Sequence, residues 1–220
     1  MDRLLQIISS HKEFLGTATV VVGSMLVLWR LGNSDQVNPI LQGMIIAVGI
    51  LLIVPFSYCK IILKRPLSAI GFQKGNAWAG IGGSVLAIAA ALAIFFVLWN
   101  FTSLLQEYRL PVAVEEQFLF FVLYEVILNG FIVFLFEVFF RGFIMLLWLR
   151  RLGIWSVFAQ AAFIASLFYF GSDIGATTIP YLVFAPFAGL IAYQSRSIWY
   201  SCGASWFYFF LIDAIVLIFR

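Results

Sequence analysis

The chain is poor in charged residues and has almost no histidine or cysteine. Of its 220 residues, 10% are charged, one is histidine and two are cysteine. So small a charged fraction cannot cover the surface of a water-soluble domain. Cys59 and Cys202 form no Cys-x-x-Cys or Cys/His pattern, so the sequence predicts no disulfide and no metal site at them. The lone His11 excludes any site that needs two histidines.

Apolar and aromatic side chains dominate instead, at 64% and 18% of the chain. A run of about 20 apolar residues crosses the roughly 30 Å of hydrocarbon in a bilayer. We therefore predict an all-α, polytopic membrane helix bundle with about seven transmembrane helices. The predicted spans are residues 14–31, 40–62, 78–101, 117–148, 154–172, 178–194 and 197–218.

The fourth predicted span, 117–148, is too long for one perpendicular crossing. At a rise of about 1.5 Å per residue it would extend for about 48 Å. We expect it to tilt, to kink near Asn129-Gly130, or to continue beyond the membrane. In the third span, Gly83, Ala87 and Ala91 recur every four residues, a small-residue pattern that favours close helix packing. The partner helix is either internal or part of another subunit.

Basic residues gather at alternate connections between the predicted spans. They are Arg3, Lys12, Lys60, Lys64, Arg65, Lys74, Arg150, Arg151 and Arg196. The positive-inside rule then places the N-terminus on the cytoplasmic side and the C-terminus on the opposite side, in a membrane that the sequence does not identify. We expect the first span to be retained and not cleaved as a signal peptide. Membrane lipids are expected partners, whereas no basic, aromatic-rich groove indicates nucleic acid.

Glu137 and Arg141 lie one helical turn apart inside an otherwise apolar run. Each ionised side chain near a bilayer centre costs about 2.5 to 3.5 kcal/mol on insertion scales. Two such residues four positions apart must therefore be paired, functional, or both. A structural ion pair and a functional site are equally compatible with this spacing.

The segment Glu137 to Phe143 resembles the first motif of the CPBP family, Glu-Glu-x-x-x-Arg followed by Gly and an apolar residue. That family contains CAAX-type prenyl-protein endopeptidases and bacteriocin-processing and immunity proteins. The segment 65–72 and the residues Gly189 and Ser197-Ile198-Trp199 resemble further parts of the family pattern. The resemblance covers about residues 65–215, and it implies an N-terminal segment, 1–64, with two transmembrane helices and a CPBP-like transmembrane core, 65–220.

The chain departs from the family at the positions that would perform catalysis. Phe136 stands where the first glutamate is expected, and Ser172 replaces the histidine of the second motif, Phe-x-x-x-His. In the third motif, His-x-x-x-Asn or Asp, Ser205 and Phe209 occupy the two ends. The resemblance implies that the missing residues activate water and stabilise the oxyanion, and losing such groups typically costs about 10² to 10⁴ in rate.

The leading hypothesis is therefore a non-catalytic CPBP-like protein that acts as a structural or binding subunit of a complex with other integral membrane subunits. Its former catalytic groove, formed by Phe136, Phe168, Ser172, Ser205 and Phe209, would hold a partner helix, a lipid or a lipid-tailed cofactor. No specific cofactor and no metal is predicted. Glu137 and Arg141 are the vestigial motif, and no residue is assigned as catalytic.

Two alternatives remain open from the sequence. The first is an active intramembrane endopeptidase in which Glu137 is the base. The second is a transporter or ion-conducting protein that uses Glu125, Glu137 and Asp213, which requires these residues to share a polar path. For Glu125 an interfacial position is the simpler expectation, and for Asp213 an exposed edge or a local hydrogen bond.

Overall fold

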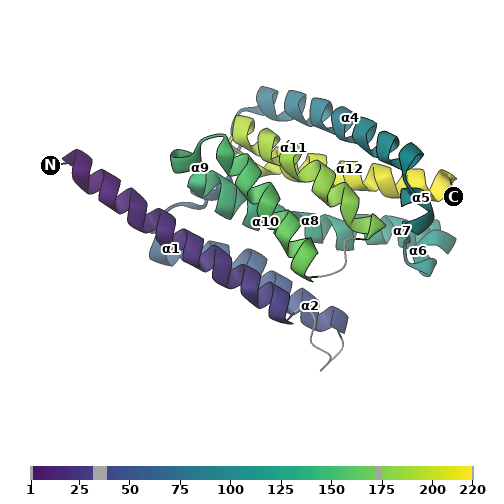
Figure 1. The fold of residues 1–220 in the computed structure, drawn as a ribbon, viewed down its shortest axis with the longest axis horizontal. Coiled ribbons are helices and arrows are strands. Elements are labelled where there is room, and N and C mark those ends of the chain that lie inside the picture. Colours follow the sequence, from purple (N-terminus) through teal and green to yellow (C-terminus); the bar gives the residue numbers. More distant parts are fainter. Residues whose placement is uncertain (1, 32–38, 172–174, 220) are drawn as a thin grey trace.

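The computed structural model describes residues 2–31, 39–171 and 175–219, and these contain helices and no strand (Figure 1). Most of them form long helices that lie side by side, as predicted for an all-α bundle. The α-helices are α1 (Asp2–Leu31), α2 (Pro39–Val48), α3 (Val54–Ser57), α4 (Ala77–Phe101), α5 (Leu104–Glu107), α6 (Val112–Glu116), α7 (Phe118–Leu123), α8 (Gly130–Phe136), α9 (Leu147–Leu152), α10 (Trp155–Gly171), α11 (Ile179–Ser195) and α12 (Ile198–Phe219). The π-helical segments are η1 (Gly49–Ile53), η2 (Tyr58–Ile62), η4 (Tyr124–Asn129) and η5 (Glu137–Leu146), and the 3₁₀ turns are η3 (Leu67–Ile70) and η6 (Ala176–Thr178).

Six of the helical segments in the described residues are long and apolar enough to cross a membrane. They are Lys12–Arg30, Gln42–Ile62, Ala77–Phe101, Phe118–Leu152, Ala176–Ser195 and Ile198–Phe219. The fifth predicted span, 154–172, falls on α10, which has 17 residues and is a shorter apolar helix than the six candidate spans. The six candidate spans are compatible with a multi-pass membrane protein, and the predicted count of seven exceeds them by the short α10.

The long fourth span is one continuous helical segment, Phe118–Leu152, of 35 residues. It alternates between α-helical and π-helical turns, with η4 ending at Asn129 and η5 beginning at Glu137. The length of this segment predicted a tilt, a kink or an extension, whereas the π-helical turns were not predicted. Such turns widen a helix and are frequent at functional positions.

The small-residue ladder of α4 packs inside the same chain, against α11. A methyl group added at Gly83 would meet Ile191 and Gln194 of α11 in ordinary van der Waals contact. Ala87 and Ala91 are buried in the same layer. Of the two partners left open by the sequence, the internal helix is the one that the structure shows, and α4, α11 and α12 form one side of the bundle (Figure 1).

The π-helical segment η5 lies at the centre of the fold. It packs against α10, α11, α12, α3, η1 and η3. Nine of its ten residues are buried, including Glu137 and Arg141. A helix surrounded on every side must be apolar all round, so the two charged residues are the exception that requires local compensation.

The turn η3 docks on η5 at a glycine. The carbonyl oxygen of Ile70 would lie only 2.7 Å from a side chain added at Gly142. Gly71 follows in the left-handed region, with φ 88°, and its carbonyl accepts a hydrogen bond of 3.1 Å from the backbone N–H of Ile198. Glycine at 142 therefore allows η3 to approach the turn that carries Arg141.

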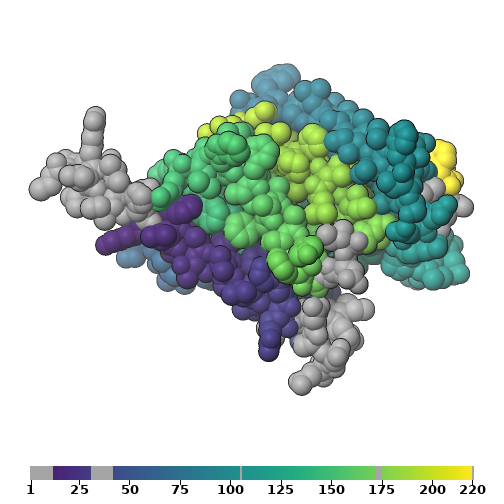
Figure 2. All heavy atoms as spheres, viewed as in Figure 1, coloured from purple at the N-terminus to yellow at the C-terminus, as the bar shows by residue number. Residues whose placement is uncertain are grey.

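The predicted N-terminal segment, 1–64, packs against the rest of the chain. Figure 2 shows α1 lying along α10, with which it is in contact. Arg65 forms an ion pair with Glu13 of α1, with Nη1 and Oε1 2.7 Å apart. The boundary between 1–64 and 65–220 stays a prediction, because these contacts join the two segments and do not separate them.

Replacing Gly142 with alanine is expected to destabilise the fold. The added methyl group would force η3 away from η5, and overpacking of this kind costs about 1 to 3 kcal/mol. The free energy of unfolding, measured by denaturant titration in detergent micelles, reports the loss. Gly82→Ala in α4 is the matched control: its added methyl group meets nothing within 4 Å, so stability should be unchanged or slightly raised. Equal free energies of unfolding for the two variants would contradict the prediction that η3 packs too closely on Gly142 to accept a side chain.

Candidate functional site

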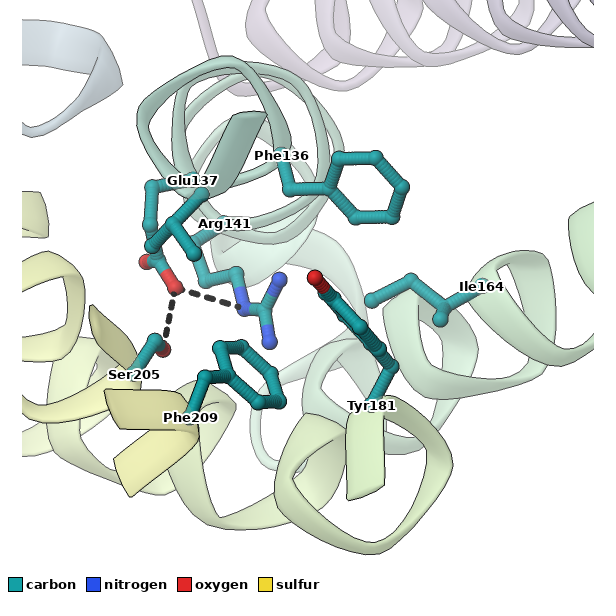
Figure 3. A pocket seen from close by; sticks show the side chains of 8 residues that line it. Phe136, Glu137, Arg141, Ile164, Tyr181, Ser205 and Phe209 are labelled. Carbon is teal, nitrogen blue, oxygen red and sulfur yellow. Dashed lines mark hydrogen bonds and ion pairs between the residues drawn. The ribbon is translucent and has the colours of Figure 1, made fainter. Parts of the chain in front are cut away.

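The carboxylate of Glu137 is held by hydroxyl groups from α12. Ser201 Oγ donates to Glu137 Oε2 at 2.5 Å. Ser205 Oγ donates to Oε1 at 2.9 Å, as Figure 3 shows. The two serines lie four residues apart, so they share one face of α12. Glu137 is 1% exposed. Both of its oxygens are thus engaged, which satisfies a charge that would otherwise be costly in apolar surroundings.

Arg141 completes the cluster as an ion pair with Glu137. Its Nε lies 3.5 Å from Glu137 Oε1, and the side chain is buried. The Nε–H of Arg141 does not form a hydrogen bond with Glu137. Within the described part of the chain this buried Nε has no hydrogen-bond acceptor. The pair that the sequence predicted from four-residue spacing is therefore present, with a guanidinium group that is incompletely hydrogen-bonded.

The guanidinium group faces a small chamber (Figure 3). The volume of the chamber is about 10 Å³, which is close to the minimum that holds one water molecule. Its walls come from α8, η5, α10, α11 and α12. The lining residues are Val133, Phe136, Glu137, Arg141, Ile164, Tyr181, Ser205 and Phe209.

Aromatic rings close this chamber on one side. Tyr181 and Phe209 are stacked with their ring centroids 4.1 Å apart, and Phe136 lies 6.1 Å from Tyr181. Phe168 joins the group, 6.2 Å from Phe136 and 5.7 Å from Tyr181. The predicted groove residues Phe136, Phe168 and Phe209 are therefore brought together, with Tyr181 among them.

A larger cavity of about 260 Å³ lies on the other side of these rings. Phe136, Tyr181 and Phe209 line both spaces. The further lining residues are Tyr108, Arg109, Leu110, Tyr124, Asn129, Ile132, Phe168, Thr177, Thr178 and Asp213. Many of these belong to the connection between α4 and α7, to η6 and to the last turns of α12, so the cavity lies toward one end of the bundle.

Two buried carboxyl groups lie beside the larger cavity. Asp213 is 4% exposed and accepts a hydrogen bond of 2.5 Å from the hydroxyl group of Tyr108. Glu125 is 0% exposed and accepts one of 2.8 Å from the amide of Asn129. The expected exposed edge for Asp213 is wrong, and its hydrogen bond is not local in sequence, because Tyr108 is 105 residues away and comes from the connection between α5 and α6. The interfacial position expected for Glu125 stays a prediction, but its side chain is buried inside the protein, where η4 directs it toward Asn129.

Tyr108 lies outside the candidate spans, between α5 and α6. Its burial, together with the negative charge of Asp213 and their hydrogen bond, raises the pKa of the Tyr108 phenol well above its ordinary value. The hydroxyl group therefore keeps its proton at neutral pH and acts as the donor to Asp213.

Neither of the two serines predicted to line the groove is among the described residues that line the larger cavity. Ser172 lies outside the described residues, so its predicted place in the groove is not tested. Ser205 contacts Glu137 and not the larger cavity. Sequence reasoning missed Ser201, for which the signal was its four-residue spacing from Ser205, and Tyr181, for which the apolar sequence of α11 contains no distinguishing signal.

Searches of protein-family models, of curated proteins and of solved structures find no match to this chain. The two chambers therefore define the chemistry that the site offers. The small chamber offers a carboxylate whose two oxygens each accept a hydrogen bond from a serine, and a buried guanidinium group, beside room for about one water molecule. The larger cavity offers an aromatic wall, hydroxyl groups and a buried carboxyl group.

Glu137→Gln is expected to destabilise the protein strongly. Removing one partner of a buried ion pair leaves the other charge uncompensated, at a cost of about 3 to 5 kcal/mol. The measurement is the free energy of unfolding in micelles, with Glu13→Gln as the matched control. Glu13 pairs with Arg65 in a partly exposed position, where such a pair contributes about 1 kcal/mol or less. If both variants lost a similar amount of unfolding free energy, the buried Glu137–Arg141 pair would contribute no more to stability than the partly exposed Glu13–Arg65 pair.

Proposed function

We propose that the protein is a non-catalytic, CPBP-like integral membrane protein that acts as a binding or structural subunit of a membrane complex. The observation that carries this proposal is the state of the Glu137 carboxylate. Two serine hydroxyl groups donate to its two oxygens and Arg141 lies beside it. A general base must have an oxygen within hydrogen-bond reach of the proton that it removes. Each Glu137 oxygen already accepts a hydrogen bond, and the chamber beside it, about 10 Å³, has room for about one water molecule and no substrate.

The neighbouring residue supports the same proposal. Phe136 extends its ring between the two chambers, and a phenyl ring can neither accept a proton nor stabilise an oxyanion. Ser205 donates to Glu137 and is four residues before Phe209 on α12. The groups at these positions therefore stabilise the buried charge and pack together, which suits a structural or binding role.

The aromatic wall indicates what is bound. Small-molecule sites are concave and mostly apolar, with few polar groups placed at defined positions. The larger cavity has this character: Phe136, Phe168 and Phe209 form its apolar part, and Tyr108 and Asp213 are polar groups on its lining. A lipid or a lipid-tailed molecule is the occupant proposed for it.

Direct ejection of the protein from its own membrane into a native mass spectrometer tests the subunit role. We expect a stoichiometric protein partner. Phe209→Leu, a change in the cavity wall, should reduce any co-isolated lipid several-fold. Phe219→Leu is the matched control, because Phe219 is exposed on the same helix and should leave the lipid unchanged. A lone chain that carries neither partner nor lipid would overturn the proposal.

The enzymatic alternative makes a different prediction. If Glu137 were a catalytic base, cleavage of a prenylated peptide by the purified protein would be lost in Glu137→Gln while circular dichroism still showed a folded bundle. We expect no cleavage by the unchanged protein under conditions in which an active intramembrane endopeptidase works. Cleavage that depends on Glu137 would replace the non-catalytic assignment.

A further inference from the structure

The larger cavity combines buried carboxyl groups with aromatic rings. It has a volume of about 260 Å³ and lies toward the end of the bundle where α5, α6, α7 and the C-terminal end of α12 gather (Figure 1). This volume exceeds what one metal ion or a few water molecules require, since a water molecule occupies about 30 Å³ in the liquid. The space is therefore suited to a small organic group.

The carboxyl groups beside the cavity lack a basic partner. Asp213 and Glu125 are close enough to interact with one another. Within the described residues neither forms an ion pair with lysine or arginine, and Glu125 Oε1 has no hydrogen-bond donor. Two carboxylates in contact repel when both are ionised. One positive charge between them, either a proton or a cationic ligand, removes this repulsion.

Arg109 is the basic residue on the cavity lining, and it does not fulfil this role. Its side chain is exposed, whereas Asp213 is buried. An exposed guanidinium group is screened by solvent, while a buried carboxylate is not. An anionic ligand would meet Asp213 at close range, so the interior of the cavity favours a cation.

The aromatic rings favour the same kind of ligand. The cavity is lined by the rings of Tyr108, Tyr124, Phe136, Phe168, Tyr181 and Phe209. The faces of aromatic rings attract ammonium groups, and several rings around one ammonium group form the cages that bind quaternary amines. A carboxylate together with such rings recognises both the charge and the apolar substituents of an organic cation.

We infer that the larger cavity binds the ammonium group of an amphipathic organic cation, with Asp213 as the counter-charge and the aromatic rings around its apolar substituents. This inference rests on the proposed binding function and specifies its ligand. The ammonium group has two chemical sources, the head group of an amine-containing lipid and a free amine.

The test uses the full chain in nanodiscs of phosphatidylglycerol, which contains no amine. The probe is benzyltrimethylammonium, and its uncharged isostere, neopentylbenzene, is the matched comparison. Isothermal titration should show one saturable site for the cation. Asp213→Asn keeps the size of the side chain and an acceptor for Tyr108, and it should weaken binding of the cation at least tenfold without changing binding of neopentylbenzene.

A second pair of variants tests the aromatic rings. Phe209→Leu should weaken binding of the cation several-fold, and Phe219→Leu should leave it unchanged. Repeating the titration in phosphatidylcholine nanodiscs distinguishes the sources. A lipid head group in the cavity would compete with the probe and would be retained as one lipid per chain in native mass spectrometry. If the natural ligand is a free amine and not a lipid head group, the probe should bind with the same affinity in both kinds of nanodisc.

The outcomes separate this inference from the proposed function. If neopentylbenzene or a co-isolated lipid binds but the cation does not, or if Asp213→Asn binds the cation as tightly as the unchanged chain, the carboxyl pair holds only a proton. The ammonium inference then fails and the binding function stands. If no probe and no lipid binds and no partner co-isolates, both fail.

Discussion

The fold depends on compensating two charges at the centre of an apolar bundle. Glu137 and Arg141 lie on η5, the segment that packs against six other elements. A buried ion pair recovers its desolvation cost only when the remaining polar atoms also have partners. Ser201 and Ser205 supply these partners to the carboxylate, which ties the position of α12 to that of η5. The close approach of η3 at Gly142 then fixes the opposite side of the same turn.

The aromatic rings divide the polar groups of the interior into two environments. On one side of Phe136, Tyr181 and Phe209, a carboxylate accepts a hydrogen bond at each oxygen and the free volume is about 10 Å³. On the other side, Asp213 lines a space of about 260 Å³. A carboxyl group lines each of these two spaces, but only the second space has room for a molecule larger than water. This difference is why a structural role is proposed for the first group and a binding role for the second.

The long apolar windows predicted helices that the structure contains, because length and hydrophobicity alone decide whether a segment can span a bilayer. The α10 helix, at 17 residues, is shorter than any other helical segment that was predicted to span. Six other helical segments are long and apolar enough to cross a membrane. The π-helical turns of η4 and η5 were not predictable, since their side chains differ little from those of an α-helix and packing decides the local pitch. The partner of the α4 ladder was likewise left open, because small residues permit close approach without selecting a neighbour.

The sequence by itself determined that Glu137 and Arg141 would lie close to one another, because residues four apart on a helix are neighbours, and the structure shows that they form an ion pair. It also determined that His11 offers no histidine pair for catalysis. The hydroxyl donors to Glu137 and the meeting of Glu125 with Asp213 beside one cavity were decided only by the tertiary structure. These contacts join segments distant in the chain, and the packing of helices against one another, which no local pattern encodes, brings them together.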